Sequence, residues 1–177
     1  MGFFILLFLS SLVLLWRSYF FFLPIERAKV WGYGFQQLAK FISDHPQDHF
    51  ISDQARTKPV YIELAFYLKL PPQQLQQSVD PAIKDNYYQQ FEFNSERKFA
   101  NIEIRNINWE TDIYQPQIII GDELAISEEQ AQEHNLTQVL EIRDPLNQFI
   151  FRGYQTHPKE KCTNSRIKSQ YCEQIHY

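Results

Sequence analysis

"MGFFILLFLSSLVLLWRSYFFFLP" (residues 1–24) opens the sequence and decides how the rest is organised. The segment up to Trp16 contains no charged residue, and the apolar run resumes after Arg17. A helix needs about 20 apolar residues to cross the hydrocarbon core of a bilayer, so residues 1–23 are predicted to form a transmembrane helix. Trp16, Arg17 and Tyr19 then mark its C-terminal interface, where Arg17 extends its charge toward the headgroups.

A cleaved signal peptide and a buried core helix are the alternative interpretations of this segment. A signal peptide has a basic region ahead of its apolar run and small residues at its cleavage site. Here nothing basic precedes the run, and bulky aromatic residues follow it. A core helix of a small domain fits poorly, because nearly the whole surface of the segment is apolar. The membrane helix remains the preferred interpretation.

The composition limits the function of the rest of the chain. With 177 residues in all, the sequence has room for one compact domain behind the helix. Charged residues make up 21% and hydrophobic residues 44%, which is typical of a folded chain. The net charge of −4 offers no basic surface for nucleic acid, so no nucleic-acid partner is expected. No motif for a reaction appears, so the sequence predicts no catalytic residue, no metal and no cofactor.

The chain divides into four predicted parts. Pro24 is expected to end the transmembrane helix, and residues 24–34 form a juxtamembrane connector. An α/β domain over residues 35–156 follows, and residues 157–177 form a polar tail that is expected to be loose apart from a possible disulfide loop.

Hydrophobic periodicity predicts alternating helices and strands in the domain. Polar residues 73–93 are expected to form a loop with a short helical piece, and Ser127 begins a capping box with Gln130. The order of elements indicates an α/β fold with a mixed sheet and a terminal β-hairpin. The expected elements are helices over 35–45, 58–70 and 127–135, strands over 49–53, 98–109 and 117–122, and a hairpin formed by 138–144 and 148–155 around Pro145–Asn147.

Four residues after the first predicted strand are candidates for ligand binding: Asp53, Arg56, Lys58 and Tyr61. Asp53 follows the strand at its carboxyl end, where open α/β sheets bind ligands. Arg56 and Lys58 stand at the start of the next helix, where backbone N–H groups favour anions such as a sugar phosphate or a lipid phosphate. The alternative is structural: Asp53 pairs with Arg56 or caps the turn, and Thr57 caps the helix.

The segment "SDHPQDHFISD" (residues 43–53) gathers acidic residues and two histidines, which suggests a metal site. His45 and His49 would share one face of a helix, but Pro46 breaks that helix and the spacing loses its meaning. A polar loop between helix and strand is the preferred interpretation.

Two features of the sequence disagree about which side of the membrane the domain occupies. Cys162 and Cys172 lie close together in "CTNSRIKSQYC" and are candidates for a disulfide, which suits an oxidising, extracytoplasmic compartment. Two unpaired surface thiols are the alternative. Arg17, Arg27 and Lys29 follow the apolar run, and for a lone helix they favour a cytoplasmic domain.

Five segments together carry a resemblance to a known family. They are "WGYGFQQLAKFIS" (31–43), "HFISDQARTKPVYIELAFYLKLPPQQLQQ" (49–77), "IEIRNINWETD" (102–112), "IIIGDELAIS" (118–127) and "VLEIRDPLNQFIFRGY" (139–154). From about Ile5 to Tyr154, the chain resembles the C-terminal soluble module of bacterial membrane glycosyltransferases of the multi-spanning GT-C type. The likeness is to protein mannosyltransferases and lipid A aminoarabinose transferases, in which the last transmembrane helix leads into an extracytoplasmic α/β domain.

The resemblance implies a function but supplies no catalytic residue. In that family, the acidic residues that act on the acceptor lie in an early extracytoplasmic loop, among transmembrane helices with no counterpart in this sequence. The expectation is therefore an accessory domain of a polyprenyl-phosphate-sugar-dependent glycosyltransferase (a hexosyltransferase) that is not catalytic alone. Its expected partners are membrane lipid, the multi-spanning part of the transferase and a lipid-linked sugar. The alternatives are an autonomous single-pass extracytoplasmic binding module and an anchored enzyme.

Overall fold

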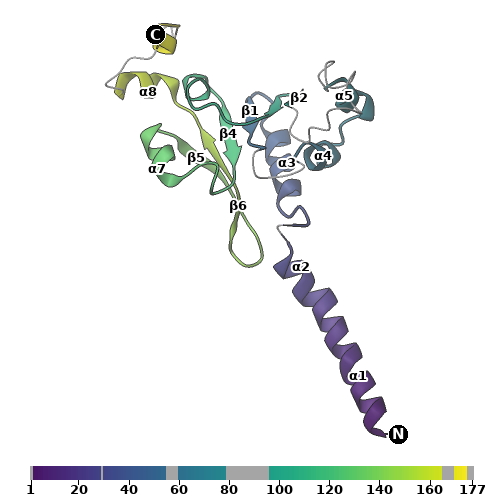
Figure 1. The fold of residues 1–177 in the computed structure, drawn as a ribbon. Helices are drawn as coiled ribbons and strands as arrows, with labels where there is room; N and C mark the ends of the chain where they lie inside the picture. Colours follow the sequence, from purple (N-terminus) through teal and green to yellow (C-terminus); the bar gives the residue numbers. More distant parts are fainter. Residues whose placement is uncertain (1, 29, 55–59, 79–95, 165–169, 175–177) are drawn as a thin grey trace, which may run out of the picture.

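A computed structural model describes residues 2–28, 30–54, 60–78, 96–164 and 170–174. The apolar N-terminal segment is one continuous helix that projects away from an α/β domain (Figure 1). It consists of α1 (Gly2–Arg17), the π-helical turn η1 (Ser18–Phe22) and α2 (Leu23–Glu26). None of its residues is buried, and its 25 residues are long and apolar enough to span a membrane. At about 1.5 Å per residue the helix measures roughly 37 Å, against about 30 Å for the hydrocarbon core.

The helix passes through Pro24 and ends at Glu26, three residues beyond the predicted end. Proline inside an α-helix lacks an N–H donor, and its ring clashes with the carbonyl group four residues before it. The wider turn η1 lies just ahead of Pro24, and the Leu23 N–H reaches back five residues to the Ser18 carbonyl. This π-helical turn relieves the crowding, so the helix continues.

The connector between the helix and the domain is a series of hydrogen-bonded turns. The Trp31 N–H donates to the Arg27 carbonyl at 3.0 Å, and the Tyr33 N–H donates to the Ala28 carbonyl at 3.0 Å. Gly34 has φ +95°, in the left-handed region that favours glycine. These bonds lead the described part of the connector, residues 27–28 and 30–34, into the first core helix.

The domain is built on a six-stranded mixed sheet with the order β2-β3-β1-β4-β6-β5. The three central strands are parallel, and the flanking strands are antiparallel to their neighbours. The predicted α/β fold with a mixed sheet and a terminal β5–β6 hairpin is confirmed. The strands are β1 (Phe50–Ser52), β2 (Arg97–Phe99), β3 (Ile102–Ile104), β4 (Ile118–Gly121), β5 (Thr137–Arg143) and β6 (Phe149–Gln155).

Helices cover both faces of this sheet. On one face, α3 (Phe35–Asp44) and α4 (Val60–Tyr67) pack on a cluster that includes the buried isoleucines of β3 and β4. α3 buries Phe35, Leu38, Ala39 and Ile42, the four residues whose helical spacing predicted it. On the other face, α7 (Glu128–Glu133) starts with the predicted capping box of Ser127 and Gln130, and its Ala131 joins a smaller cluster.

The strand predicted over residues 98–109 is replaced by two strands. β2 and β3 pair as a hairpin in which Phe99 lies opposite Ile102, so Ala100 and Asn101 form the turn. Ala100 adopts φ +51°, a conformation that two-residue hairpin turns require and that glycine or asparagine usually supplies. Ile102 and Ile104 of β3 lie on one side of the strand, and both side chains are fully buried.

The tail, which was expected to be loose, folds in its described part. It contains α8 (Pro158–Asn164) and the 3₁₀ turn η3 (Gln170–Gln174). The Tyr171 ring of η3 stacks on Tyr114 of the 3₁₀ turn η2 (Asp112–Tyr114), with the ring centroids 5.7 Å apart. The short helical piece predicted within the Gln-rich stretch is also present, as α5 (Pro72–Gln77). The rest of that stretch, from residue 79, lies outside the described residues.

Candidate functional site

The carboxyl ends of the three parallel strands meet at one edge of the sheet. Going along the chain, β3 is added on one side of β1 and β4 on the other. The carboxyl end of β1 is therefore a switch point of the kind at which open α/β sheets bind ligands. Asp53 follows β1 directly, so the structure places this predicted residue where the sequence put it.

Asp53 is buried at this edge, with 5% of its surface exposed. Its N–H donates to the Ile120 carbonyl at 2.8 Å, which ties the residue to β4. Ser52 and Gln54 beside it are also buried. Three consecutive buried polar residues therefore lie at this edge of the sheet, and a backbone hydrogen bond joins them to β4.

Of the other three predicted ligand-binding residues, Tyr61 alone lies among the described residues. Arg56 and Lys58 lie outside the described residues, as does Thr57. Tyr61 is half-buried on α4, and the guanidinium of Arg97 from β2 lies 4.0 Å from the centroid of its ring. Tyr61 therefore packs against the main apolar cluster and forms a cation–π pair with an edge strand.

A network of charged side chains, which the sequence analysis did not predict, lies on the β2–β3 side of the sheet. Two guanidinium nitrogens of Arg105 donate to the two carboxylate oxygens of Asp112, each at 2.8 Å. Glu103 accepts from Lys98 at 2.6 Å and from Arg105 at 2.9 Å. Lys98, Glu103 and Arg105 alternate with buried residues along the hairpin, and this alternation is the sequence signal that could have revealed the network.

The pKa values in this network indicate fixed charges. Burial by itself raises the pKa of Glu103, but hydrogen bonds from Lys98 and Arg105 outweigh burial and lower that pKa to about 2. Hydrogen bonding to Asp112 raises the pKa of Arg105, although burial opposes this. Each carboxylate is matched by a cation, so the network fastens the β2–β3 hairpin to η2.

Two other buried carboxylates have structural roles. Asp122, after β4, accepts hydrogen bonds from the N–H groups of Leu124 and Ala125 at 3.0 and 2.8 Å. Asp144 accepts from the N–H groups of Leu146 and Gln148 at 2.9 and 2.8 Å, within the turn of the β5–β6 hairpin. Both carboxylates thus close turns.

The two histidines of the suspected metal segment point to different partners. Nδ1 of His45 lies 2.8 Å from the Phe41 carbonyl, at the end of α3. His49 Nδ1 lies 3.1 Å from Oε1 of Gln117, and its Nε2 lies 3.5 Å from Glu103. Within the part of the chain that the structure describes, no three His, Cys, Asp or Glu residues are grouped to hold a metal ion.

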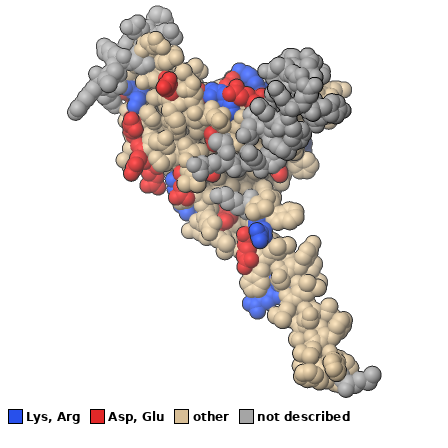
Figure 2. Space-filling model, viewed as in Figure 1, with Lys and Arg blue, Asp and Glu red and all other residues tan. Residues whose placement is uncertain are grey.

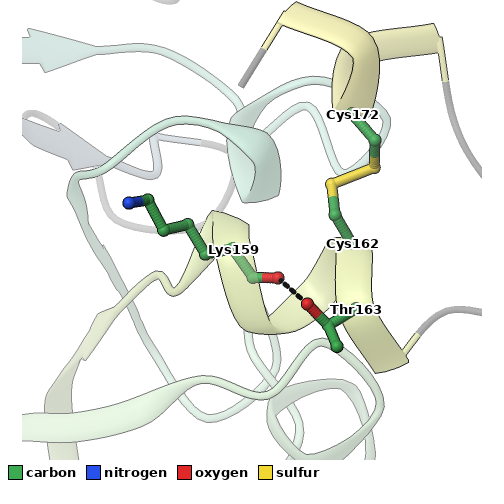
Figure 3. Close-up of a disulfide and its surroundings, with 4 residues drawn as sticks. All are labelled: Lys159, Cys162, Thr163 and Cys172. Carbon is green, nitrogen blue, oxygen red and sulfur yellow. Dashed lines mark hydrogen bonds between the residues drawn. A yellow bond between two sulfur atoms is a disulfide. The ribbon is translucent and has the colours of Figure 1, made fainter. Parts of the chain in front are cut away.

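Cys162 and Cys172 are joined by a disulfide that links α8 to η3 (Figure 3). Close by, the Thr163 hydroxyl donates to the Lys159 carbonyl at 2.8 Å within α8. The Lys161 ammonium donates to the Glu133 carbonyl at 2.8 Å, which attaches α8 to the end of α7. The cross-linked tail is therefore fastened to the domain at more than one point.

A cleft lies where the anchor helix meets the domain. It has a volume of about 520 Å³, within the range of roughly 300–1,000 Å³ that is typical of small-molecule sites. Tyr19, Phe20, Leu23 and Pro24 line it from the anchor, Trp31 and Tyr33 line it from the connector, and Gln36, Gln37 and Tyr67 line it from the domain. None of the described residues that line the cleft is charged. No pattern in the sequence predicted this site, because its lining comes from the anchor, the connector and two separate helices of the domain.

The distribution of charged side chains agrees with the position of the cleft, between an apolar helix and a charged domain. In the space-filling view, charged side chains lie over the domain and at the upper end of the helix, and the rest of the helix is uncharged (Figure 2). The guanidinium carbon of Arg17 lies 5.1 Å from the centroid of the Phe22 ring, so this side chain extends toward the domain. Arg17 therefore directs its charge along the helix toward the domain.

No family model, no curated protein sequence and no solved structure matches this chain.

Proposed function

We propose that this chain is a membrane-anchored accessory domain of a polyprenyl-phosphate-sugar-dependent glycosyltransferase, which does not catalyse sugar transfer alone. The observation that carries the proposal is the short, hydrogen-bonded connector between an apolar helix and an α/β domain. Such a connection holds the domain at the membrane surface, where a lipid-linked sugar presents its headgroup. The five segments that resemble the C-terminal modules of GT-C transferases supply the family.

The disposition of the buried acids supports an accessory role. Activation of an acceptor hydroxyl needs a carboxylate that is positioned within reach of the proton it removes. Asp112 is occupied by Arg105, while Asp122 and Asp144 accept backbone hydrogen bonds in turns. These three carboxylates serve the fold, and the fourth buried acid of the described residues, Asp53, is the one that the control experiment below examines. The contribution proposed for the domain is to cover or shape an active site formed by a multi-spanning partner.

The disulfide supports an extracytoplasmic position for the domain. Disulfides persist in oxidising compartments and are rare in the cytosol. The basic residues after the helix favour the opposite orientation, but that rule applies to an isolated helix rather than to the last helix of a larger assembly. We therefore propose that the domain faces the compartment in which lipid-linked sugars are transferred.

The proposal is tested by deleting the gene for this chain in its source organism and assaying the membranes for sugar transfer. We expect membranes from the deletion strain to lose transfer from a polyprenyl-phosphate sugar, and the full-length chain to restore it. A chain without residues 2–26 should not restore transfer, because it is no longer held at the membrane surface. Purified full-length protein should show no turnover with the same donors and acceptors.

Turnover by the purified chain alone, lost in Asp53→Asn, would instead establish an anchored enzyme. The matched control is Asp48→Asn, which changes an acid in the loop at the opposite, amino end of β1. Unchanged transfer in membranes that lack the chain would overturn the glycosyltransferase assignment.

The uncharged cleft favours a second candidate function, an autonomous single-pass binding module. Its lining is mostly aromatic and aliphatic, with glutamine amides as the polar groups of its α3 wall. Sites of this composition bind apolar ligands and orient them with a few polar contacts. Retention of a bound apolar molecule by a chain whose deletion leaves sugar transfer intact would favour this function.

A further inference from the structure

We infer that the cleft between the anchor and the domain binds the hydrocarbon chain of a bilayer phospholipid. The inference concerns the cleft alone and does not depend on the glycosyltransferase assignment. It rests on three properties of the cleft: its level relative to the membrane, the chemistry of its walls and the packing of the connector on its domain side.

The length of the anchor helix places the cleft at the membrane surface. About 20 residues fill the hydrocarbon core, and the helix has 25. The charge of Arg17 favours the interface over the bilayer centre, so the surface of the hydrocarbon falls between Arg17 and Pro24. Phe20, Leu23 and Pro24 form the anchor wall over this same stretch. The cleft therefore opens where phospholipid chains end and headgroups begin.

The walls of the cleft suit a hydrocarbon chain better than a charged ligand. A buried anion or cation needs opposite charges or several directed donors, and the described walls contain no ionised side chain. Trp31 is 75% exposed beside the cleft, and an aromatic residue with this exposure at an interface is stabilised by contact with lipid. Gln36 and Gln37 of α3 line the cleft and are exposed, so they are its polar residues on this side.

On the domain side of the cleft, the connector packs closely against α4, which favours the binding of a flexible chain. Gly32 adopts φ +73°, and a Cβ at this position would lie 3.1 Å from a carboxylate oxygen of Glu63 on α4. This close approach brings the connector against α4, which ends at Tyr67 on the domain side of the cleft. A preformed apolar site loses less conformational freedom when it binds a flexible chain.

Tyr67 provides the diagnostic position. It belongs to a helix that follows the anchor by more than thirty residues, and it contacts hydrocarbon only if a chain leaves the bilayer and enters the cleft. Ile62 and Phe66 on the same helix are also exposed, with 48% and 72% of their surfaces accessible, but they do not line the cleft. They report a different event, in which the domain lies down on the membrane.

Photo-crosslinking tests the inference with the unaltered full-length chain. The protein is reconstituted into phosphatidylcholine vesicles that carry a diazirine near the methyl end of one acyl chain, and adducts are mapped by mass spectrometry after illumination. We expect adducts on Tyr67 and on the Tyr33–Gln37 segment, in addition to those along the anchor. Adducts confined to residues 2–23, or equal labelling of Tyr67 and Phe66, would overturn the inference.

A charged cleft should exclude the chain. In Gln36→Glu/Gln37→Glu we expect labelling of Tyr67 to fall by about tenfold, since an ionised group beside a hydrocarbon chain costs at least about 1.4 kcal/mol. Labelling of the anchor should not change. Both positions are exposed on the first turns of α3, where acidic residues favour the helix dipole, so the fold should be retained.

The matched control is Gln132→Glu, the same change at an exposed position on α7, which should leave every adduct unchanged. Undiminished labelling of Tyr67 in the doubly substituted chain would mean that the hydrocarbon reaches Tyr67 by another route, and would also overturn the inference. Loss of sugar transfer has no part in this readout, so the test remains distinct from that of the proposed function.

Discussion

The two faces of the sheet are closed by different physical means. Under α3 and α4, fifteen buried apolar residues form one cluster, and Phe35 and Phe151 meet edge to face at 4.9 Å within it. On the opposite face the described cluster has four buried members, and the charged network of Arg105 and Asp112 lies beside it. The first face is stabilised by apolar burial, which is insensitive to pH, whereas the second depends on hydrogen bonds and ion pairs.

This difference between the two faces predicts which substitutions and conditions destabilise the domain at each face. Loss of volume should damage the first face most, and loss of charge should damage the second. In each experiment below, the full-length chain is unfolded in detergent micelles and followed by near-ultraviolet circular dichroism, which reports the tertiary packing of the domain.

Truncation in the apolar cluster should have the largest effect. Phe151 is 1% exposed, so Phe151→Ala removes a ring and leaves a cavity beside Phe35. We expect a loss of about 4 kcal/mol in the free energy of unfolding. Phe66→Ala is the control, because Phe66 is 72% exposed and its truncation should change stability by less than about 0.5 kcal/mol. Equal effects of the two changes would contradict the packing described for the first face.

Breaking the ion pair of the second face should have the next largest effect. In Asp112→Asn the Arg105 guanidinium loses its charged partner, and we expect a loss of about 3 kcal/mol. The double variant Arg105→Met/Asp112→Leu removes both charges and should lose less than Asp112→Asn, because no uncompensated charge remains. A larger loss in the double variant would mean that the pair is worth more than apolar side chains of similar volume.

Removing the disulfide should be slightly less costly. Cys162 and Cys172 are separated by 10 residues, which gives about 2.7 kcal/mol in the chain-entropy model. Cys162→Ser/Cys172→Ser should release η3 and the ring of Tyr171 from Tyr114 of η2. Mild reduction of the unaltered protein should reproduce the same loss, and alkylation of both thiols before any reduction would contradict the bond itself.

Mild acid should have the smallest effect, and it should act on the second face. The His134 ring stacks on Trp109, with centroids 5.1 Å apart, and its buried Nδ1 has no described hydrogen-bond partner. Burial lowers the pKa of His134, and the charge of Lys161 lowers it further. Protonation of His134 therefore favours the unfolded state. The contribution of neutral His134 to the free energy of unfolding is complete above pH 6.5 and is lost as the pH falls below that value.

His134→Gln should flatten the decline in the urea midpoint between pH 7 and pH 5, roughly the range in which an unperturbed histidine titrates. Glu103 acts in a separate range: its pKa falls from 4.5 to about 2 on folding, so its contribution is complete above pH 4.5 and is lost between these two values. A decline that persists unchanged above pH 5 in His134→Gln would assign the effect to another group.

Local pattern was enough to predict most of the elements. The spacing of Phe35, Leu38, Ala39 and Ile42 defined α3, the run Ile118–Gly121 defined β4, and Ser127 marked the start of α7. These signals work because each depends on residues a few positions apart. The hairpin turn at Ala100 was not predicted, because its local signal is absent. Neither Ala100 nor Asn101 is a glycine, the residue that most often indicates a positive φ.

The sequence by itself determined that an apolar helix is followed by one α/β domain, because apolar length and periodicity are properties of contiguous segments. Only the tertiary structure decided what the side chains do. His49 meets Gln117, 68 positions along the chain, only because β1 pairs with β4, and the connector at Gly32 meets Glu63 of α4 only in the folded chain. Partners that are distant in sequence meet through packing, and no local pattern encodes that meeting.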